Sequence, residues 1–258
     1  ECGTGRKFLL PLPTATKAPR QKTLKPWTSA GLPGKASCDA PRIIQNQKEL
    51  KLSKDKVRTQ RRFRGSIMPT ASHPEIRRVR REGKYPSIHG NKLWKSSCLL
   101  IDYLKQNPPE HAGSVIDVGC GWGASGIWCA KTLGSAVTSM DADPDVFPFL
   151  DVAARLNGVQ TTPLVSRFEK LTGRQLAQFD MLIAADICFW DELVDPVYRM
   201  VDRAVKAGVK QILIADPERP TFHQMAARCV ERYCAEVIDW STRAPIKASG
   251  AILVIHNA

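Results

Sequence analysis

Residues 115–123 read VIDVGCGWG, a short apolar run that ends in an acidic residue and three spaced glycines. A second apolar run, residues 136–140, ends in Asp141. A buried strand, a glycine turn, a helix and a second strand with an acid at its tip form the unit with which open parallel sheets bind nucleosides. These segments therefore predict an α/β fold with a nucleoside site at the carboxyl ends of the strands.

The glycines and the second acid each have a predicted task. Gly119 and Gly121 permit a sharp turn at positive φ and let a ligand approach bare backbone. The expected helix over residues 124–133 directs unsatisfied N–H groups toward that ligand. Asp141 lies 22 residues beyond Gly119, where an acid at a strand tip accepts hydrogen bonds from ribose hydroxyls.

The identity of the nucleoside has more than one interpretation. Residues 121–126 also read G-x-G-x-x-G, with Asp141 20 residues after Gly121, so a nicotinamide dinucleotide is admissible. Asp117 argues against it, because a carboxylate repels a pyrophosphate. S-adenosylmethionine carries an ammonium and a sulfonium and has no phosphate, so it suits an acid at this position. A glycine-rich turn without a ligand is the third interpretation.

Hydrophobic periodicity extends the predicted sheet to seven strands. Five apolar segments alternate with helical stripes, which is typical of a doubly wound sheet with helices on both faces. The last two segments are joined by a loop too short for a crossover helix, so the final strand pair should be antiparallel. The expected strands are residues 115–118, 136–140, 161–165, 179–185, 211–215, 236–240 and 251–255.

The positive charge is concentrated at the N-terminus. Residues 1–67 hold 16 basic and 4 acidic residues, whereas residues 68–258 hold 22 and 21. The first 67 residues are rich in proline and have no apolar period, which predicts a basic, disordered tail. A nucleic-acid arm, a targeting segment and translated sequence upstream of Met68 remain open. We expect residues 68–93 to form a basic lead-in or lid and residues 94–258 to form the catalytic domain.

Other residue types narrow the class of protein. Eight cysteines form no C-x-x-C pair and five histidines are scattered, so we predict no metal site, and reduced thiols in a cytoplasmic protein. The sequence has no apolar run of 18 residues, so we expect no membrane partner. A nucleic acid could be bound only through the basic N-terminal segment.

Four segments resemble a known enzyme family. The run D-x-G-x-G-x-G at residues 117–123 resembles motif I of the class I, seven-strand methyltransferases. Residues 93–97, 185–192 and 215–220 are similar to segments of the protein-lysine methyltransferases in the branch that includes the electron-transfer-flavoprotein β-subunit lysine methyltransferase and its bacterial relatives. Two positions depart from the pattern: Phe189 replaces the usual Tyr, and Glu218 replaces the Gly of D-P-G-R-P.

The resemblance implies S-adenosylmethionine as cofactor and assigns roles to particular residues. The expected cofactor-binding residues are Trp94, Asp117, Gly119, Cys120, Gly121, Gly123, Asp141, Ala142, Phe168, Glu169 and Ala185. Asp117 is expected near the ammonium, Asp141 at the ribose, and Phe168 or Glu169 beside the adenine. Asp186 is expected to orient the substrate amine or accept its proton, with Phe189 and Trp190 as channel walls.

The substrate class stays open between several candidates. A protein lysine leads, and a small-molecule amine or RNA is the enzymatic alternative. A cofactor-binding regulator without turnover, or a nicotinamide-binding protein, would be a different class altogether.

Overall fold

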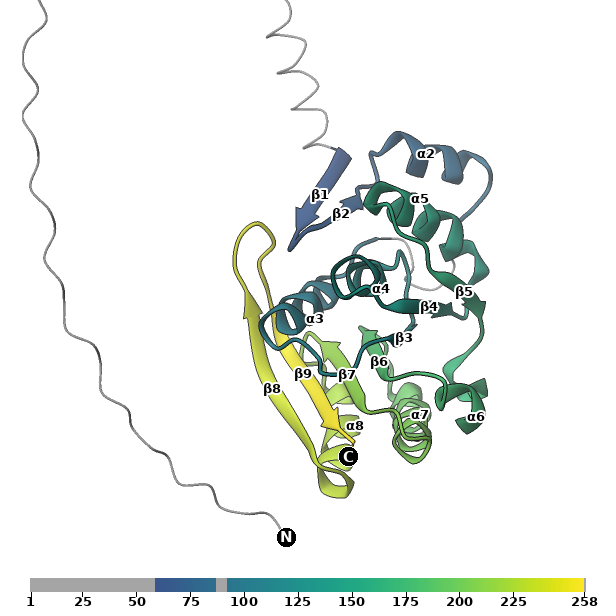
Figure 1. Cartoon of the computed structure of the whole chain (residues 1–258). Coiled ribbons are helices and arrows are strands. Elements are labelled where there is room, and N and C mark those ends of the chain that lie inside the picture. Colours follow the sequence, from purple (N-terminus) through teal and green to yellow (C-terminus); the bar gives the residue numbers. More distant parts are fainter. Residues whose placement is uncertain (1–58, 87–91, 258) are drawn as a thin grey trace, which may run out of the picture. The chain divides into compact units, whose positions relative to one another are not determined.

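The computed structural model describes residues 59–86 and 92–257. Its centre is a seven-stranded sheet in the order β5-β4-β3-β6-β7-β9-β8 (Figure 1). The strands are β3 (Ser114–Val118), β4 (Ala136–Asp141), β5 (Thr162–Val165), β6 (Met181–Ala185), β7 (Gln211–Asp216), β8 (Ala235–Thr242) and β9 (Ala248–His256). The first five in chain order pair in parallel, whereas β9 is antiparallel to both β7 and β8. The predicted α/β fold and its antiparallel final pair are confirmed.

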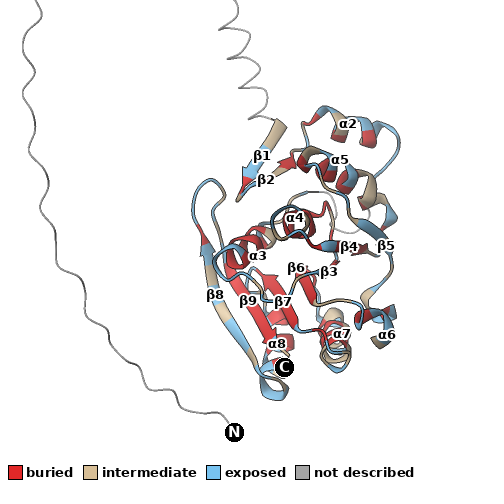
Figure 2. Cartoon of the chain, in the orientation of Figure 1, coloured by how far each residue is buried: buried red, intermediate tan, exposed pale blue. Residues whose placement is uncertain are grey.

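The sheet has a separate hydrophobic core on each face because successive side chains of a strand point to opposite sides. Val115 and Ile183 contribute to one core, while Ile116 and Leu182 contribute to the other. The central strands are accordingly buried along their length (Figure 2). The first core is covered by α3 (Lys95–Gln106), α4 (Ala124–Trp128) and α5 (Phe147–Asn157), and the second by α6 (Gly173–Leu176), α7 (Val194–Lys206) and α8 (Pro220–Arg232).

The helix expected over residues 124–133 has two parts. It starts as α4 and continues as a π-helical turn, η1 (Cys129–Leu133), which ends at Gly134 with φ of 73°. Three of the connections between strands and helices contain a single turn of 3-10 helix. These turns are η2 (Pro144–Val146), η3 (Phe168–Lys170) and η4 (Asp191–Leu193).

A hairpin and a helix that the sequence did not predict precede the sheet. The hairpin consists of β1 (Gln60–Phe63) and β2 (Ser66–Pro69), and α2 (Pro74–Arg81) follows it. Phe63 and Met68 are buried in the same core as α3 and α5. The predicted division after residue 67 therefore cuts through a hairpin that is packed on the domain. Residues 1–58 of the predicted tail lie outside the described residues.

Polar contacts anchor this hairpin to three different helical segments. The Arg64 guanidinium pairs with Asp102 of α3 (Nε–Oδ1, 2.5 Å), and the Arg64 carbonyl accepts a hydrogen bond from the Trp128 indole. Asn157 of α5 bonds both backbone groups of Ile67. Each hairpin residue lies 38 to 90 residues away from its partner in the chain, so the hairpin is held by tertiary contacts.

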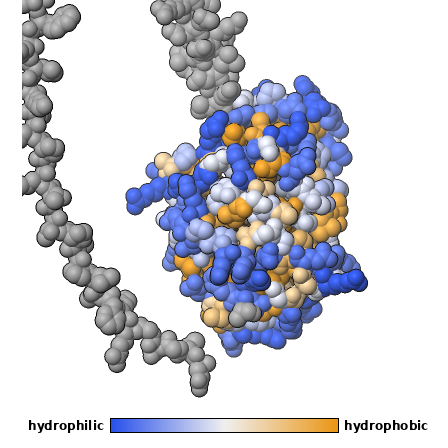
Figure 3. Space-filling model, in the orientation of Figure 1, coloured by the Kyte–Doolittle hydropathy of each residue, from blue (hydrophilic) through white to orange (hydrophobic). Residues whose placement is uncertain are grey.

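The outer surface is mixed in polarity. The face in Figure 3 carries small groups of apolar residues among hydrophilic ones, as is usual for a folded surface. Among the exposed large apolar side chains, Trp190 is 52% exposed and lies close to the site described below. No helix within residues 59–86 and 92–257 is long and apolar enough to cross a bilayer.

Candidate functional site

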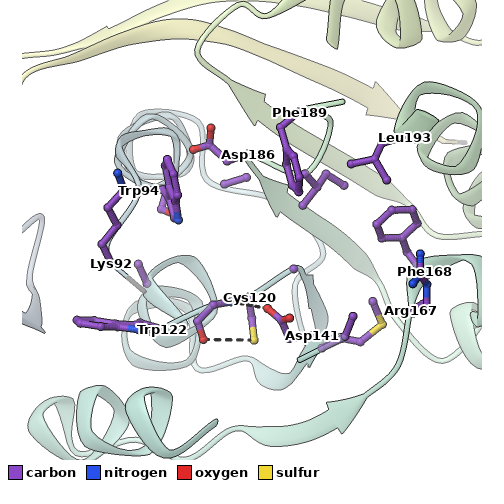
Figure 4. Close-up of a pocket in the computed structure, with 18 of the residues that line it drawn as sticks. Lys92, Trp94, Cys120, Trp122, Asp141, Arg167, Phe168, Asp186, Phe189 and Leu193 are labelled. Carbon is purple, nitrogen blue, oxygen red and sulfur yellow. Dashed lines mark hydrogen bonds between the residues drawn. The ribbon is translucent and has the colours of Figure 1, made fainter. Parts of the chain in front are cut away.

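A cavity of about 370 Å³ opens where the carboxyl ends of β3, β4, β6 and β7 meet (Figure 4). All but two of the predicted site residues line it. Those that do are Trp94, Gly119, Cys120, Gly121, Asp141, Ala142, Phe168, Glu169, Ala185, Asp186, Phe189 and Trp190. The topology thus brings together residues from five separate segments of the sequence.

The glycine loop presents bare backbone to this cavity. Gly119 and Gly121 have φ values of +67° and +51°. A Cβ atom at Gly119 would lie 2.7 Å from Ile187 Cγ2, whereas one at Gly121 would meet no atom within 4 Å. Because Gly121 lines the cavity, that open space is available to a ligand. The loop therefore fits a nucleoside cofactor that lies directly on the main chain.

Asp141 ends β4 and holds the glycine loop in position. Its Oδ2 accepts a hydrogen bond from the Gly121 N–H at 3.0 Å, and its Oδ1 accepts one from the Asp143 N–H at 3.0 Å. Burial raises the pKa of Asp141, and these backbone hydrogen bonds lower it. A carboxylate has about four lone-pair sites, so both oxygens can still accept hydrogen bonds from the two hydroxyls of a ribose.

The two predicted residues that do not line the cavity are Asp117 and Gly123. Asp117 precedes the strand end and points toward α4, where its Oδ2 accepts the Gly126 N–H at 3.0 Å. A Cβ atom at Gly123 would lie 2.8 Å from Leu150 of α5, so this glycine allows close helix packing. Asp117 is 3% exposed, and burial raises its pKa to about 7.

The raised pKa of Asp117 predicts a pH-dependent stability. Between its unfolded pKa of 3.8 and about 7 the folded state binds more protons than the unfolded state, so this group's contribution is lost as the pH rises. The unfolding free energy of Asp117→Asn, relative to that of wild type, should therefore rise by roughly 2–3 kcal/mol as the pH is raised from 5 to 8. Urea unfolding of both proteins at the two pH values measures this change. The pKa of Asp180 is lowered below 3.8 by hydrogen bonds from Ser114, so this group is ionised in both states above pH 5, and Asp180→Asn should differ from wild type by a constant amount between pH 5 and pH 8. A pH-independent difference for Asp117→Asn would contradict this expectation.

Asp186 follows β6 and is held by an arginine from the loop after β7. Arg219 Nη2 lies 2.8 Å from Asp186 Oδ1, and its Nη1 lies 2.7 Å from Asp216 Oδ2. The Asp186 N–H donates to the Ala215 carbonyl, and the residue adopts φ of 60°. One carboxylate oxygen of Asp186 is thereby fixed toward Arg219. The other has no hydrogen-bond partner among the described residues and can accept one from a substrate.

Phe189 and Trp190 form an aromatic wall beside Asp186. Their rings are 4.6 Å apart and inclined by 74°, an edge-to-face contact. Both residues line the cavity, and Trp190 is also half exposed to solvent. The wall therefore extends from the interior of the cavity to the protein surface.

Glu218 occupies a backbone conformation that favours glycine. Its φ is +69° and its side chain is exposed. We expect Glu218→Gly to stabilise the protein by roughly 0.5–1 kcal/mol, because removing the left-handed strain outweighs the entropy that glycine gains on unfolding. Thermal unfolding of Glu218→Gly and Glu218→Ala tests this, since alanine keeps the strain and removes only the charge. Equal melting temperatures for the two variants would be the contrary result.

Several cavity residues had no role in the sequence analysis. They are Lys92, Leu93, Ser97, Trp122, Ala124, Met140, Ser166, Arg167, Ile187, Leu193 and Arg219. Trp122 stands within the glycine motif, and its ring stacks on Phe149 at 5.4 Å. Lys92 lies outside the segments that resemble the enzyme family, whereas Arg219 lies within residues 215–220, which do resemble it but were given no role for this arginine. Within the described part of the chain, no group of three His, Cys, Asp or Glu side chains is placed to hold a metal ion.

Comparison with known proteins identifies the domain that contains this cavity. A family model described as a methyltransferase domain matches residues 115–208. The electron transfer flavoprotein beta subunit lysine methyltransferase of Danio rerio is 28% identical over 139 residues, 54% of this chain and 53% of the relative. The human protein of the same name is 24% identical over 149 residues, 57% and 55% of the two chains. The chain thus spans about half the length of the curated relatives that it matches.

Solved structures share the fold. TrmN from Thermus thermophilus superposes with a TM-score of 0.50 at 17% identity, over 63% of this chain and 49% of that one. A human methyltransferase 10 domain containing protein superposes with a TM-score of 0.50 at 11% identity, over 71% and 95%. The predicted family resemblance is confirmed: the chain contains a class I S-adenosylmethionine-dependent methyltransferase domain and is a distant homologue of the electron transfer flavoprotein beta subunit lysine methyltransferases.

Proposed function

We propose that this protein N-methylates a lysine side chain of another protein. The observation that carries the proposal is the placement of Asp186 beside the Phe189–Trp190 wall, at the rim of the cavity that the glycine loop lines. The relatives that match half of the chain are lysine methyltransferases by name, which supports the same substrate class.

The residues of the chain would prepare the substrate amine. S-adenosylmethionine, when bound, supplies a methyl group on a sulfonium that a neutral amine can displace. A lysine with a free pKa of about 10.4 is almost entirely charged at neutral pH. Phe189 and Trp190 would hold its ammonium by cation–π contact and lower its pKa by excluding water. The unpartnered oxygen of Asp186 would orient the amine and receive its proton, while Arg219 keeps the carboxylate in place.

The chain's own segments would hold the cofactor. Gly119 and Gly121 would contact the methionine moiety, Asp141 would bind the ribose, and Phe168 or Glu169 would contact the adenine. All five residues line the cavity.

The buried cysteines support a cytoplasmic location: five of the six described cysteines are buried, and all six are free thiols.

The test is methyl transfer to cell-extract proteins from a donor with a radiolabelled methyl group, followed by hydrolysis and identification of the labelled amino acid. We expect label in methyl-lysine. Asp186→Asn should lower the transfer rate by about 10²–10⁴-fold with S-adenosylhomocysteine affinity retained. Asp191→Asn, an exposed acid just beyond the aromatic wall, is the matched control and should transfer normally.

Other outcomes would replace the proposal. Label in RNA or in a small molecule would move the substrate to that class. Cofactor binding without transfer to any fraction would indicate a regulator. Full activity of Asp186→Asn would remove the assigned role of this carboxylate.

A further inference from the structure

The cavity is lined by three cationic side chains, and two of them are already paired. Arg167 Nη2 lies 3.1 Å from Glu169 Oε1. Arg219 is held by two carboxylates, those of Asp186 and Asp216. Each guanidinium is therefore already engaged by at least one carboxylate of the protein.

Lys92 is the third cation, and it differs from the other two. Within residues 59–86 and 92–257 it makes no ion pair. Its Nζ lies 4.1 Å from the centroid of the Trp94 ring, a cation–π contact that orients the ammonium at the wall of the cavity. The residue is otherwise exposed, so its charge can be paired with a ligand at little cost in desolvation.

The position of Lys92 along the cavity indicates which part of a ligand it would meet. Figure 4 shows Phe168 at one end, Asp141 and Cys120 in the middle, and Lys92 with Trp94 at the opposite end. The end at Phe168 suits adenine, and the middle of the cavity at Asp141 suits a ribose. The remaining end of S-adenosylmethionine is an amino acid, whose carboxylate pairs favourably with a cationic side chain.

We propose that Lys92 binds the carboxylate of the cofactor's methionine moiety, and that Trp94 holds its side chain in position for this task. The proposal rests on the proposed methyltransferase function, since it concerns the cofactor of that same site. It adds a cofactor-binding residue that lies outside the glycine motif, in the segment immediately before α3. Charge-assisted hydrogen bonds of this kind are worth about 10- to 100-fold in affinity.

Calorimetric titration of the full chain with two ligands tests the proposal. The first ligand is S-adenosylhomocysteine, and the second is its decarboxylated analogue, which keeps the thioether and the amine. For wild type we expect S-adenosylhomocysteine to bind about 10- to 100-fold more tightly than the analogue. Lys92→Met should lose this preference by weakening only the first ligand, and Lys92→Arg should keep most of it.

The matched control is Lys95→Met. Lys95 is an exposed lysine at the start of α3 that does not line the cavity, so this variant should bind both ligands as wild type does. Equal weakening of both ligands by Lys92→Met would indicate a packing role and overturn the proposal, as would unchanged binding of both. If wild type binds neither ligand, the methyltransferase function itself is wrong. If wild type binds both ligands and Lys92→Met does not change their relative affinity, only the role of Lys92 is wrong.

Discussion

The free energy of unfolding is expected to be lower by roughly 3–5 kcal/mol or more for a chain that begins at Met68 than for one that begins at residue 59. The shorter chain lacks β1 and the following turn, whose Arg64 is the cationic partner of Asp102. Asp102 is 2% exposed and would remain as a buried carboxylate that, among the described residues, keeps only the hydrogen bonds from Gln106 and Trp240. The loss of Phe63 from the core adds a cavity, which has a further cost of similar order.

Urea unfolding of the two chains measures this difference. Arg64→Met in the longer chain should reproduce the electrostatic part of the loss. Arg62→Met, at an exposed arginine of β1 in the same hairpin, should have almost no effect. Equal unfolding free energies for the two chains would show that the hairpin contributes little to the stability of the domain.

Asp141→Ala is expected to weaken S-adenosylhomocysteine binding by at least roughly 100-fold. Two hydrogen bonds from ribose hydroxyls to a carboxylate account for this magnitude, since each is worth about 1.5–3 kcal/mol. The substitution also releases the Gly121 and Asp143 N–H groups, so the glycine loop loses the contacts that hold its shape. Calorimetric titration gives the affinity directly.

An acid in the same loop provides the control. Asp145 pairs with Lys84 at 3.0 Å and does not line the cavity, so Asp145→Ala should keep wild-type affinity. An analogue without the 2′-hydroxyl should bind wild type more weakly than S-adenosylhomocysteine does. Asp141→Ala should bind this analogue and S-adenosylhomocysteine with the same affinity. Affinity within threefold of wild type for Asp141→Ala would remove the ribose role of this residue.

The seven-strand sheet could be predicted because its information is local. Each central strand is a short apolar run, and alternate residues such as Val115 and Ile116 supply the cores on the two faces. The glycine turn could be predicted for the same reason, because positive φ at Gly119 and Gly121 selects the residue type at those positions. Asp141 followed from its position at the end of a strand.

The hairpin of β1 and β2 could not be predicted in this way. Its strands have four residues each, and two of the four residues of β1 are arginines, so the hairpin is too short for an apolar period to distinguish it from a solvated segment. Its stability comes from contacts with Asp102, Trp128 and Asn157, which are far away in the sequence. A window of neighbouring residues contains none of these partners.

The sequence by itself determined the sheet, the glycine loop and the acid at the tip of β4, because strand burial and backbone conformation depend on neighbouring residues. Only the tertiary structure decided the direction of Asp117, which the pleat turns toward α4 and away from the cavity. It also decided that Arg219 meets Asp186 and that Lys92 meets Trp94 at the cavity wall. The reason is that separate segments converge only when the sheet assembles, so neither the pairing of Arg219 with Asp186 nor the place of Lys92 at the cavity can be derived from neighbouring residues.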